Sequence, residues 1–313
     1  MRELVLTRHT EQIDPLLHVW GWEIPVYLFL GGMVAGMMIL VGVTLILGRH
    51  RHRACTCSVL PALALALLSA GMLALFLDLE HKLYVWRLYT TFQVTSPMSW
   101  GAWILVLVYP ALLAAWVVRP PALLQGLWPA FDRLTEAARR PGILKAIAAA
   151  NIGLGTALGI YTGILLSSLG ARPFWNSAIL GPLFLVSGLS SAAAFTHLVA
   201  RDPDESRAFA FADNVFLAIE LAVIGLFVIG LLSASEAHVQ AARLVLDGPF
   251  AAVFWVLVVG LGIIVPLVIQ SLAVSHRIAH TPIAPLLVMA GGVALRFVFV
   301  YAGQVSHWSR YGF

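Results

Sequence analysis

The chain has 313 residues, of which 60% are hydrophobic and only 11% are charged, and its mean hydropathy is +0.91. Soluble domains carry about 25% charged residues, so this chain has too few charges to cover a water-facing surface. Apolar stretches recur at the length of about 20 residues that crosses a hydrocarbon core. Because polar and apolar residues do not alternate along them, a membrane β-barrel is excluded. An all-α integral membrane protein is predicted.

In chain order, the apolar stretches predict eight transmembrane helices, at residues 24–47, 57–79, 100–118, 143–166, 178–200, 211–233, 250–273 and 283–303. Residues 1–23 lack the apolar segment and small-residue cleavage site of a signal peptide, so the first span is expected to act as an uncleaved insertion signal. The net charge of +4 comes from basic residues in membrane-flanking loops. The expected surroundings are therefore a lipid bilayer, with no nucleic-acid partner.

A faint internal repeat relates the two halves of the chain. Residues 25–31 resemble residues 182–188, and residues 151–163 resemble residues 291–303. The repeat predicts two tandem four-helix bundles, at 24–166 and 167–303, preceded by an N-terminal segment at 1–23 and followed by a C-terminal tail at 304–313.

Charge in the loops predicts the orientation. Arginine and lysine are concentrated in or beside the loops at 48–56, 119–142, 201–210 and 274–282. Because basic loops stay in the cytoplasm, these loops are expected on the cytoplasmic side of a prokaryotic inner membrane. Both termini and the segment at 80–99 are then periplasmic.

Few residues are suited to hold a metal. Cys55 and Cys57 are the only cysteines, and two thiols are too few for an iron–sulfur cluster, so they are expected to be ordinary reduced thiols. None of the ten histidines falls in the middle of a predicted span, which disfavours a haem held by two histidines. We expect no metal, haem or cluster in this chain, so that any such redox centre belongs to a partner.

Two ionisable residues fall inside predicted spans, which makes them functional candidates. At 1.5 Å per residue, Glu220 lies about 14 Å and Arg296 about 20 Å from the cytoplasmic ends of their spans, so the two can pair. The pair is interpreted either as a static salt bridge or as a proton relay.

A second polar group lies at the outer ends of the first, second and fourth spans. It comprises His18, Trp22, Glu23, Tyr27, Asp78, Glu80, His81 and Tyr161. A quinone site needs an apolar slot, donors to two ring oxygens and a titratable group, and these residues supply all three. The alternative is an ordinary interfacial belt of aromatic residues with solvated charges.

Three motifs stand out: Trp22-Glu-Ile-Pro-Val-Tyr-Leu-Phe-Leu-Gly-Gly32, the Asp78-Leu pair, and Ser96-Pro-Met-Ser-Trp-Gly101. Together they resemble the NrfD-like family, the membrane subunits of polysulfide reductase and related complexes. The resemblance continues through residues 161–166, 173–175 and 291–296, and so covers nearly the whole chain.

The resemblance implies a protein with eight or more membrane helices and no redox centre of its own. It implies menaquinone or ubiquinone bound near the outer face, a ferredoxin-like iron–sulfur subunit docked there, and often a molybdopterin catalytic subunit. By motif position the family's quinone pocket corresponds to Trp22, Tyr27, Asp78 and Tyr161. Many relatives follow the acidic residue with a Gly-Arg-Pro stretch, whereas this chain has residues 80–83, Glu-His-Lys-Leu.

Asp78, Glu80 and His81 are therefore the candidates for proton handling. The function expected is that of the quinone-reactive membrane subunit of a respiratory oxidoreductase, which is not active alone. Two other hypotheses remain: a proton- or ion-translocating module centred on Glu220 and Arg296, and a passive membrane anchor.

Overall fold

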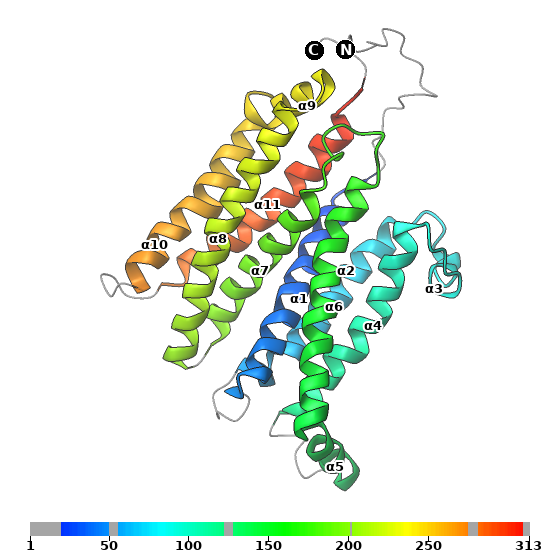
Figure 1. Ribbon diagram of the computed structural model, residues 1–313, viewed down its shortest axis with the longest axis vertical. Coiled ribbons are helices and arrows are strands. Elements are labelled where there is room, and N and C mark those ends of the chain that lie inside the picture. The colour runs from blue at the N-terminus through cyan, green and yellow to red at the C-terminus, as the bar shows by residue number, and fades with distance from the viewer. Residues whose placement is uncertain (1–19, 50–55, 122–127, 201, 275–280, 309–313) are drawn as a thin grey trace.

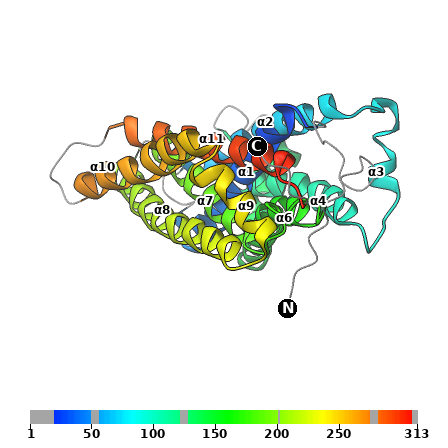
Figure 2. The ribbon, with the colours of Figure 1, turned by 90° about the horizontal axis from the view of Figure 1, so that it is seen from above.

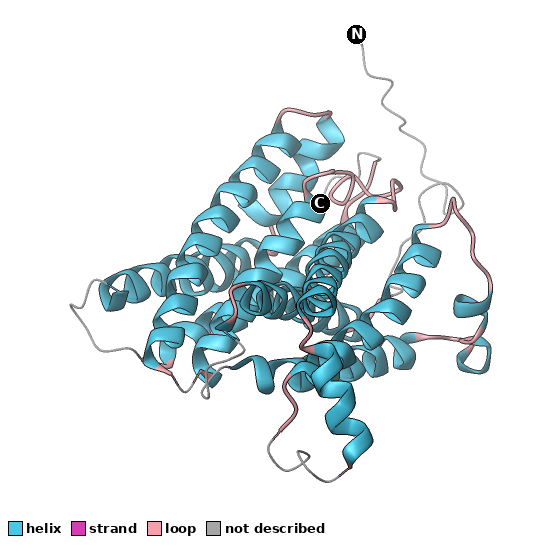
Figure 3. Ribbon diagram, turned by 60° about the horizontal axis from the view of Figure 1, so that its bottom comes forward, coloured by secondary structure: helices cyan, strands magenta, loops and turns pink. Residues whose placement is uncertain are grey.

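The computed structural model describes residues 20–49, 56–121, 128–200, 202–274 and 281–308. Within these ranges all regular secondary structure is helical (Figure 3). The predicted all-α class is confirmed.

Eight helical segments in the described residues are long and apolar enough to cross a membrane, which confirms the predicted spans. They are α1 (Glu23–Ile46), α2 (Leu60–Asp78), α4 (Pro97–Val118), α6 (Pro141–Ser167), α7 (Leu180–Val199), α8 (Pro203–Leu232), the continuous pair η5 (Val253–Ile264) and α10 (Val265–Val274), and α11 (Ile283–Val305). The element η5 is wound as a π-helix.

The first turns explain where several helices begin. Proline stands in the first turn of α2, α4, α6 and α8, where its missing N–H leaves no hydrogen bond unmade. In α8 the side chain of Asp202 also accepts a hydrogen bond from the backbone N–H of Asp204, at 3.2 Å. Because of this cap and Pro203, α8 begins eight residues before the predicted span at 211–233, as a polar turn that the hydrophobic pattern does not show.

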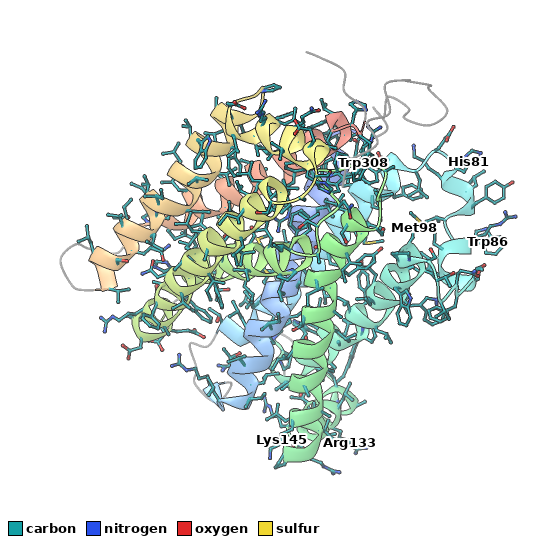
Figure 4. The ribbon with its side chains drawn as sticks, turned by 45° about the horizontal axis from the view of Figure 1, so that its top comes forward. His81, Trp86, Met98, Arg133, Lys145 and Trp308 are labelled. Atoms are coloured by element: carbon teal, nitrogen blue, oxygen red, sulfur yellow. The ribbon has the colours of Figure 1, made fainter. Side chains whose placement is uncertain are left out.

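Shorter helices connect the spans: η2 (Thr56–Ser58), η3 (Lys82–Tyr84), α3 (Arg87–Thr90), α5 (Pro129–Ala138) and α9 (Glu236–Leu246). The helices α5 and α9 lie at opposite ends of the molecule (Figure 1). We call the end with α9, where α1 begins, the upper end, and the end with α5 the lower end. His81, Met98 and Trp308 lie toward the upper end, and Arg133 and Lys145 at the lower end (Figure 4).

Helix α1 is the centre of the packing and contacts α2, α6, α7 and α11. It meets α7 at glycines: a Cβ on Gly188 would overlap the backbone of Gly32, and a Cβ on Gly36 would overlap that of Gly188. Small residues that let two backbones approach are a common basis of helix packing in membranes. Since α1 touches helices of both predicted bundles, the division into two tandem bundles remains a prediction.

Candidate functional site

Two buried tyrosines form the centre of the candidate site. Tyr27 lies one turn into α1 and is 4% exposed, and Tyr161 lies near the upper end of α6 and is 7% exposed. Their phenol groups are close enough to interact electrostatically. Within the described residues neither hydroxyl has a hydrogen-bond partner. A tyrosine hydroxyl is a hydrogen-bond donor, so both hydroxyls are available to a ligand.

The Ser96–Gly101 motif makes room for Tyr161. A Cβ on Gly101 would overlap the ring and hydroxyl of Tyr161, so only glycine lets the ring lie against the first turns of α4. The Ser99 hydroxyl accepts a hydrogen bond from the backbone of Gln93 at 3.0 Å, and the Trp100 indole donates to the carbonyl of Val94 at 2.8 Å. The motif therefore also folds the preceding connection onto the start of α4.

A third tyrosine, Tyr89 on α3, joins this group, although no motif or pattern pointed to it. The Tyr89 and Tyr27 phenols interact electrostatically. Burial, and then the phenol of Tyr109, raise the pKa of Tyr89 above its usual value. The Tyr89 hydroxyl therefore stays protonated, as a hydrogen-bond donor, at physiological pH.

Two carboxyl groups lie at the upper ends of α1 and α2. Asp78 is the last residue of α2 and is partly buried, and Glu23 is the first residue of α1. The Glu23 charge acts on Asp78. The structure thus brings together four of the predicted site residues as two pairs, Glu23 with Asp78 and Tyr27 with Tyr161. Carboxyl groups at a membrane surface can exchange protons with water.

The other predicted site residues that the structure describes are exposed. Trp22 is 52% exposed, and Glu80 and His81 are exposed in the connection that follows α2. The His81 ring lies beside that of Tyr84, at 6.4 Å between centroids. His18 lies outside the described residues.

The predicted pair of Glu220 and Arg296 is bridged by a hydroxyl. The Arg296 guanidinium is 1% exposed and donates to the Ser187 hydroxyl at 3.2 Å and to the Phe184 carbonyl at 3.1 Å. It also lies 4.1 Å from the Phe184 ring centroid, a favourable cation–π distance. The Ser187 hydroxyl in turn hydrogen-bonds Glu220. Residues from α7, α8 and α11 thus form one buried polar triad.

A second buried carboxyl group escaped the sequence reading. Asp213 is fully buried and accepts hydrogen bonds from Ser190 and Gln270, each at 2.7 Å. It precedes Glu220 by two turns on α8 and so lies about 10 Å nearer the lower end. At the edge of a span predicted to begin at 211, an aspartate cannot be told from a solvated charge. The early start of α8 places it inside the protein.

The described residues contain no group of three or more His, Cys, Asp or Glu side chains arranged to hold a metal ion. Their chemistry comes from tyrosine hydroxyls and carboxyl groups near one end of a helix bundle. Fold and site define a multi-helix integral membrane protein with a polar site near one membrane surface.

The profile of the family described as polysulphide reductase, NrfD, matches residues 6–307. The chain belongs to this family.

The similarity to known relatives extends along the sequence. The polysulfide reductase C-chain of Wolinella succinogenes is 28% identical over an alignment of 303 positions that covers 91% of the present sequence and 94% of that protein. Protein NrfD of Escherichia coli (strain K12) is 31% identical over an alignment of 317 positions, gaps included, that covers 92% of the present sequence and 96% of that protein. The selenate reductase C-subunit of Mesobacillus selenatarsenatis is 25% identical over an alignment of 321 positions, gaps included, that covers 92% of the present sequence and 74% of that protein. The protein is thus similar over more than nine tenths of its sequence to proteins named as components of polysulfide and selenate reductases and to a protein named NrfD.

Proposed function

We propose that this chain is the quinone-reactive subunit of a respiratory oxidoreductase complex in a prokaryotic inner membrane. It exchanges electrons with a ferredoxin-like iron–sulfur subunit on the periplasmic face. The terminal chemistry of anaerobic respiration belongs to a molybdopterin subunit. The family supports this proposal, since the relatives above are named as subunits of polysulfide and selenate reductases. The chain is inactive without its partners.

The observation that carries the proposal is the pair of buried tyrosines, Tyr27 and Tyr161, whose hydroxyls lack hydrogen-bond partners among the described residues. The two ring oxygens of menaquinone or ubiquinone require two such donors. The surroundings fit an apolar ring, because Tyr27 belongs to the same buried cluster as Ile24, Ala74 and Leu166. The protein groups therefore match the needs of a quinone site.

Each residue has a role that follows from its chemistry. A bound quinone supplies two-electron, two-proton carrier chemistry. The hydroxyls of Tyr27 and Tyr161 would hold the ring by donating hydrogen bonds to its oxygens. Asp78, which Glu23 approaches at the upper ends of α1 and α2, takes up or returns protons. The apolar cluster keeps bulk water away from the ring.

The basic residues of the lower end support the proposed orientation. Arg133, Arg139 and Lys145 lie on α5, directly after it, and on α6, and basic segments of this kind stay in the cytoplasm. The upper end is then periplasmic, and the iron–sulfur partner docks there. The tyrosine and carboxyl pairs lie at this end, which keeps the electron-transfer distance short.

Asp78→Asn tests the proposal, because it keeps the shape of the side chain and removes the proton acceptor. In the assembled complex we expect quinol-linked turnover to fall while activity with a soluble artificial electron carrier stays at the wild-type level. Asp247→Asn, an exposed aspartate after α9, is the matched control and should change neither activity. Equal loss of both activities would indicate failed assembly, and no loss of either would remove Asp78 from the site. If the wild-type complex shows no quinol-linked turnover, the proposal is wrong and the chain is a passive membrane anchor.

A second candidate function, proton translocation, is favoured by one observation. The triad of Arg296, Ser187 and Glu220 lies between the tyrosine site and a second buried carboxyl group, that of Asp213. Hydroxyl and carboxyl groups in sequence can pass protons across a membrane. The same triad is equally suited to a static role, as a bridged ion pair that holds three helices together.

Substitutions at Glu220 separate the two roles. If the triad is static, Glu220→Gln leaves the Arg296 charge buried and unpaired, a loss of about 3–5 kcal/mol. Assembly should then fall, and the double change with Arg296→Gln should partly restore it. If the triad carries protons, the Glu220→Gln complex assembles and turns over quinol but no longer takes up protons from the lower side in sealed vesicles.

A further inference from the structure

A pair of hydroxyl groups lies on the membrane-facing side of α2 and α4, far from either membrane surface. The Ser69 and Tyr109 hydroxyls are 3.3 Å apart, and their hydrogen bond is exposed. Ser69 is about 14 Å below the upper end of α2, and Tyr109 about 18 Å below that of α4, at 1.5 Å per residue. Both are therefore near the middle of a hydrocarbon core about 30 Å thick.

An exposed hydroxyl pair at this depth is unusual. Lipid tails offer no hydrogen bonds, so polar groups in the hydrocarbon region normally face the protein interior. A serine in a membrane helix can instead bond a carbonyl of its own helix, yet Ser69 pairs with a tyrosine of a neighbouring helix. The pair thus presents two hydroxyl oxygens to whatever lies between α2 and α4 on this side.

The surface above the pair leads to the candidate site. On α2, Leu73 and Phe76 follow Ser69 on the same helix face and are 58% and 37% exposed. Tyr109 also interacts electrostatically with Tyr89, and Tyr89 with Tyr27. Helix α3, which carries Tyr89, lies at the edge of the molecule beside α2 and α4 (Figure 2). Hydroxyls therefore occur at intervals from the middle of the membrane to the buried tyrosines.

We propose that the quinone reaches its site laterally from the bilayer between α2 and α4, with the Ser69–Tyr109 pair as the first binding point for its ring oxygens and the Tyr89 hydroxyl as the second. This inference rests on the proposed function. We call the exposed surface formed by Ser69, Leu73, Phe76 and Tyr109 the lane. Its apolar side chains match the tail of a quinone, and its hydroxyl donors match the two acceptor oxygens of the ring. Lipid tails match the apolar part alone.

Two substitutions test the route in the assembled complex, reconstituted in vesicles with isoprenoid-tailed menaquinol. Ser69→Trp obstructs the lane, and kcat/KM for menaquinol should fall about tenfold, the effect of 1.4 kcal/mol. Ala70→Trp, at the next exposed position but turned about 100° around α2, should stay within about twofold of wild type. Tyr109→Phe removes one donor and should lower kcat/KM by about two- to tenfold. Artificial-carrier activity reports whether each complex has assembled.

A labelling experiment supplies a readout that does not depend on turnover. A photoreactive azido-menaquinone should label peptides of α2 and α4, excess menaquinone should displace the label, and Ser69→Trp should reduce it where Ala70→Trp does not. Equal behaviour of the two tryptophan variants, with wild-type labelling confined to other helices, would overturn the route while leaving the quinone site in place. A wild-type complex with neither menaquinol turnover nor displaceable labelling would overturn the proposed function itself.

Discussion

At the scale of single residues, Tyr27 and Tyr161 are the strongest indication of a ligand site. A tyrosine in a membrane protein is most often an interfacial anchor with its hydroxyl in water. These two are almost fully buried, and their hydroxyls lack partners in the described part of the chain. A bound ligand with acceptor oxygens would give each hydroxyl a hydrogen bond that the described residues do not provide.

Tyr161→Phe removes a single hydroxyl and keeps the ring. A hydrogen bond of this kind contributes about 0.5–1.5 kcal/mol net, so quinol binding should weaken by up to about tenfold. Equilibrium binding to the purified complex measures the change. Tyr301→Phe on α11, whose ring lies beside Phe297, is the control and should bind quinol as the wild type does. Unchanged binding in Tyr161→Phe would exclude a hydrogen bond from this residue.

Gly101→Ala tests the same tyrosine from the other side. The added methyl group overlaps the ring and hydroxyl of Tyr161, so the ring must move and its hydroxyl leaves the position suited to a quinone oxygen. We expect a raised KM for quinol with artificial-carrier activity retained. Gly153→Ala on α6, where a Cβ meets nothing within 4 Å, is the matched control. A normal KM in both variants would show that the position of Tyr161 does not matter for quinol binding.

At the scale of elements, the contact between α1 and α7 positions the two polar groups relative to each other. Helix α1 carries Tyr27, and the Arg296 guanidinium lies against Gly32 of the same helix. Helix α7 contributes Ser187 and Phe184 to the partners of Arg296. The close approach of the two backbones therefore places the triad of Arg296, Ser187 and Glu220 against α1, the helix that carries Tyr27.

Gly188→Ala should separate these helices, because its methyl group would overlap the backbone of Gly32. Overpacking of this kind destabilises by about 1–3 kcal/mol. The expected result is a lower yield of assembled complex and earlier loss of structure on heating, measured by size-exclusion chromatography after temperature steps. In Gly225→Ala, on α8, the Cβ meets nothing within 4 Å, and yield should equal that of the wild type. Equal yields from both variants would contradict the importance of the glycine contact.

At the scale of the whole molecule, the two ends of the described chain are joined at the upper end. The side chain of Gln304 accepts a hydrogen bond from the backbone N–H of Trp20 and donates one to its carbonyl, both at 3.1 Å. The Trp20 ring packs on that of Trp175, with centroids 5.3 Å apart, and the Trp175 indole donates to the Phe299 carbonyl at 2.8 Å. These contacts fix the approach to α1, and with it the positions of Glu23 and Tyr27.

Orientation is the prediction that belongs to this scale. A reporter enzyme active only in the periplasm should be active when fused after Phe313 and inactive when fused after Arg140, because the basic segment around α5 stays inside. A reporter active only in the cytoplasm should give the opposite pattern at both positions. Cytoplasmic activity after Phe313 would reverse the orientation and move the iron–sulfur partner to the lower end.

Composition and hydrophobic pattern determined the class of the protein and its eight spans, and the motifs at 22–32, 78–79 and 96–101 indicated the family it resembles. Spans are readable because the bilayer requires about 20 apolar residues for each. The buried pair of Glu220 and Arg296 was also predictable, since charges inside an apolar run are conspicuous.

Only the tertiary structure decided which residues meet. It brought Tyr89 to Tyr27, placed the Ser187 hydroxyl between Glu220 and Arg296, buried Asp213, and left Glu80 and His81 exposed. The physical reason is that these contacts join residues of different helices, and their geometry depends on how closely the helices approach and how far each is rotated. Small residues such as Gly32, Gly101 and Gly188 set these distances. The hydrophobic pattern of a single helix does not specify which helix packs against it or how closely.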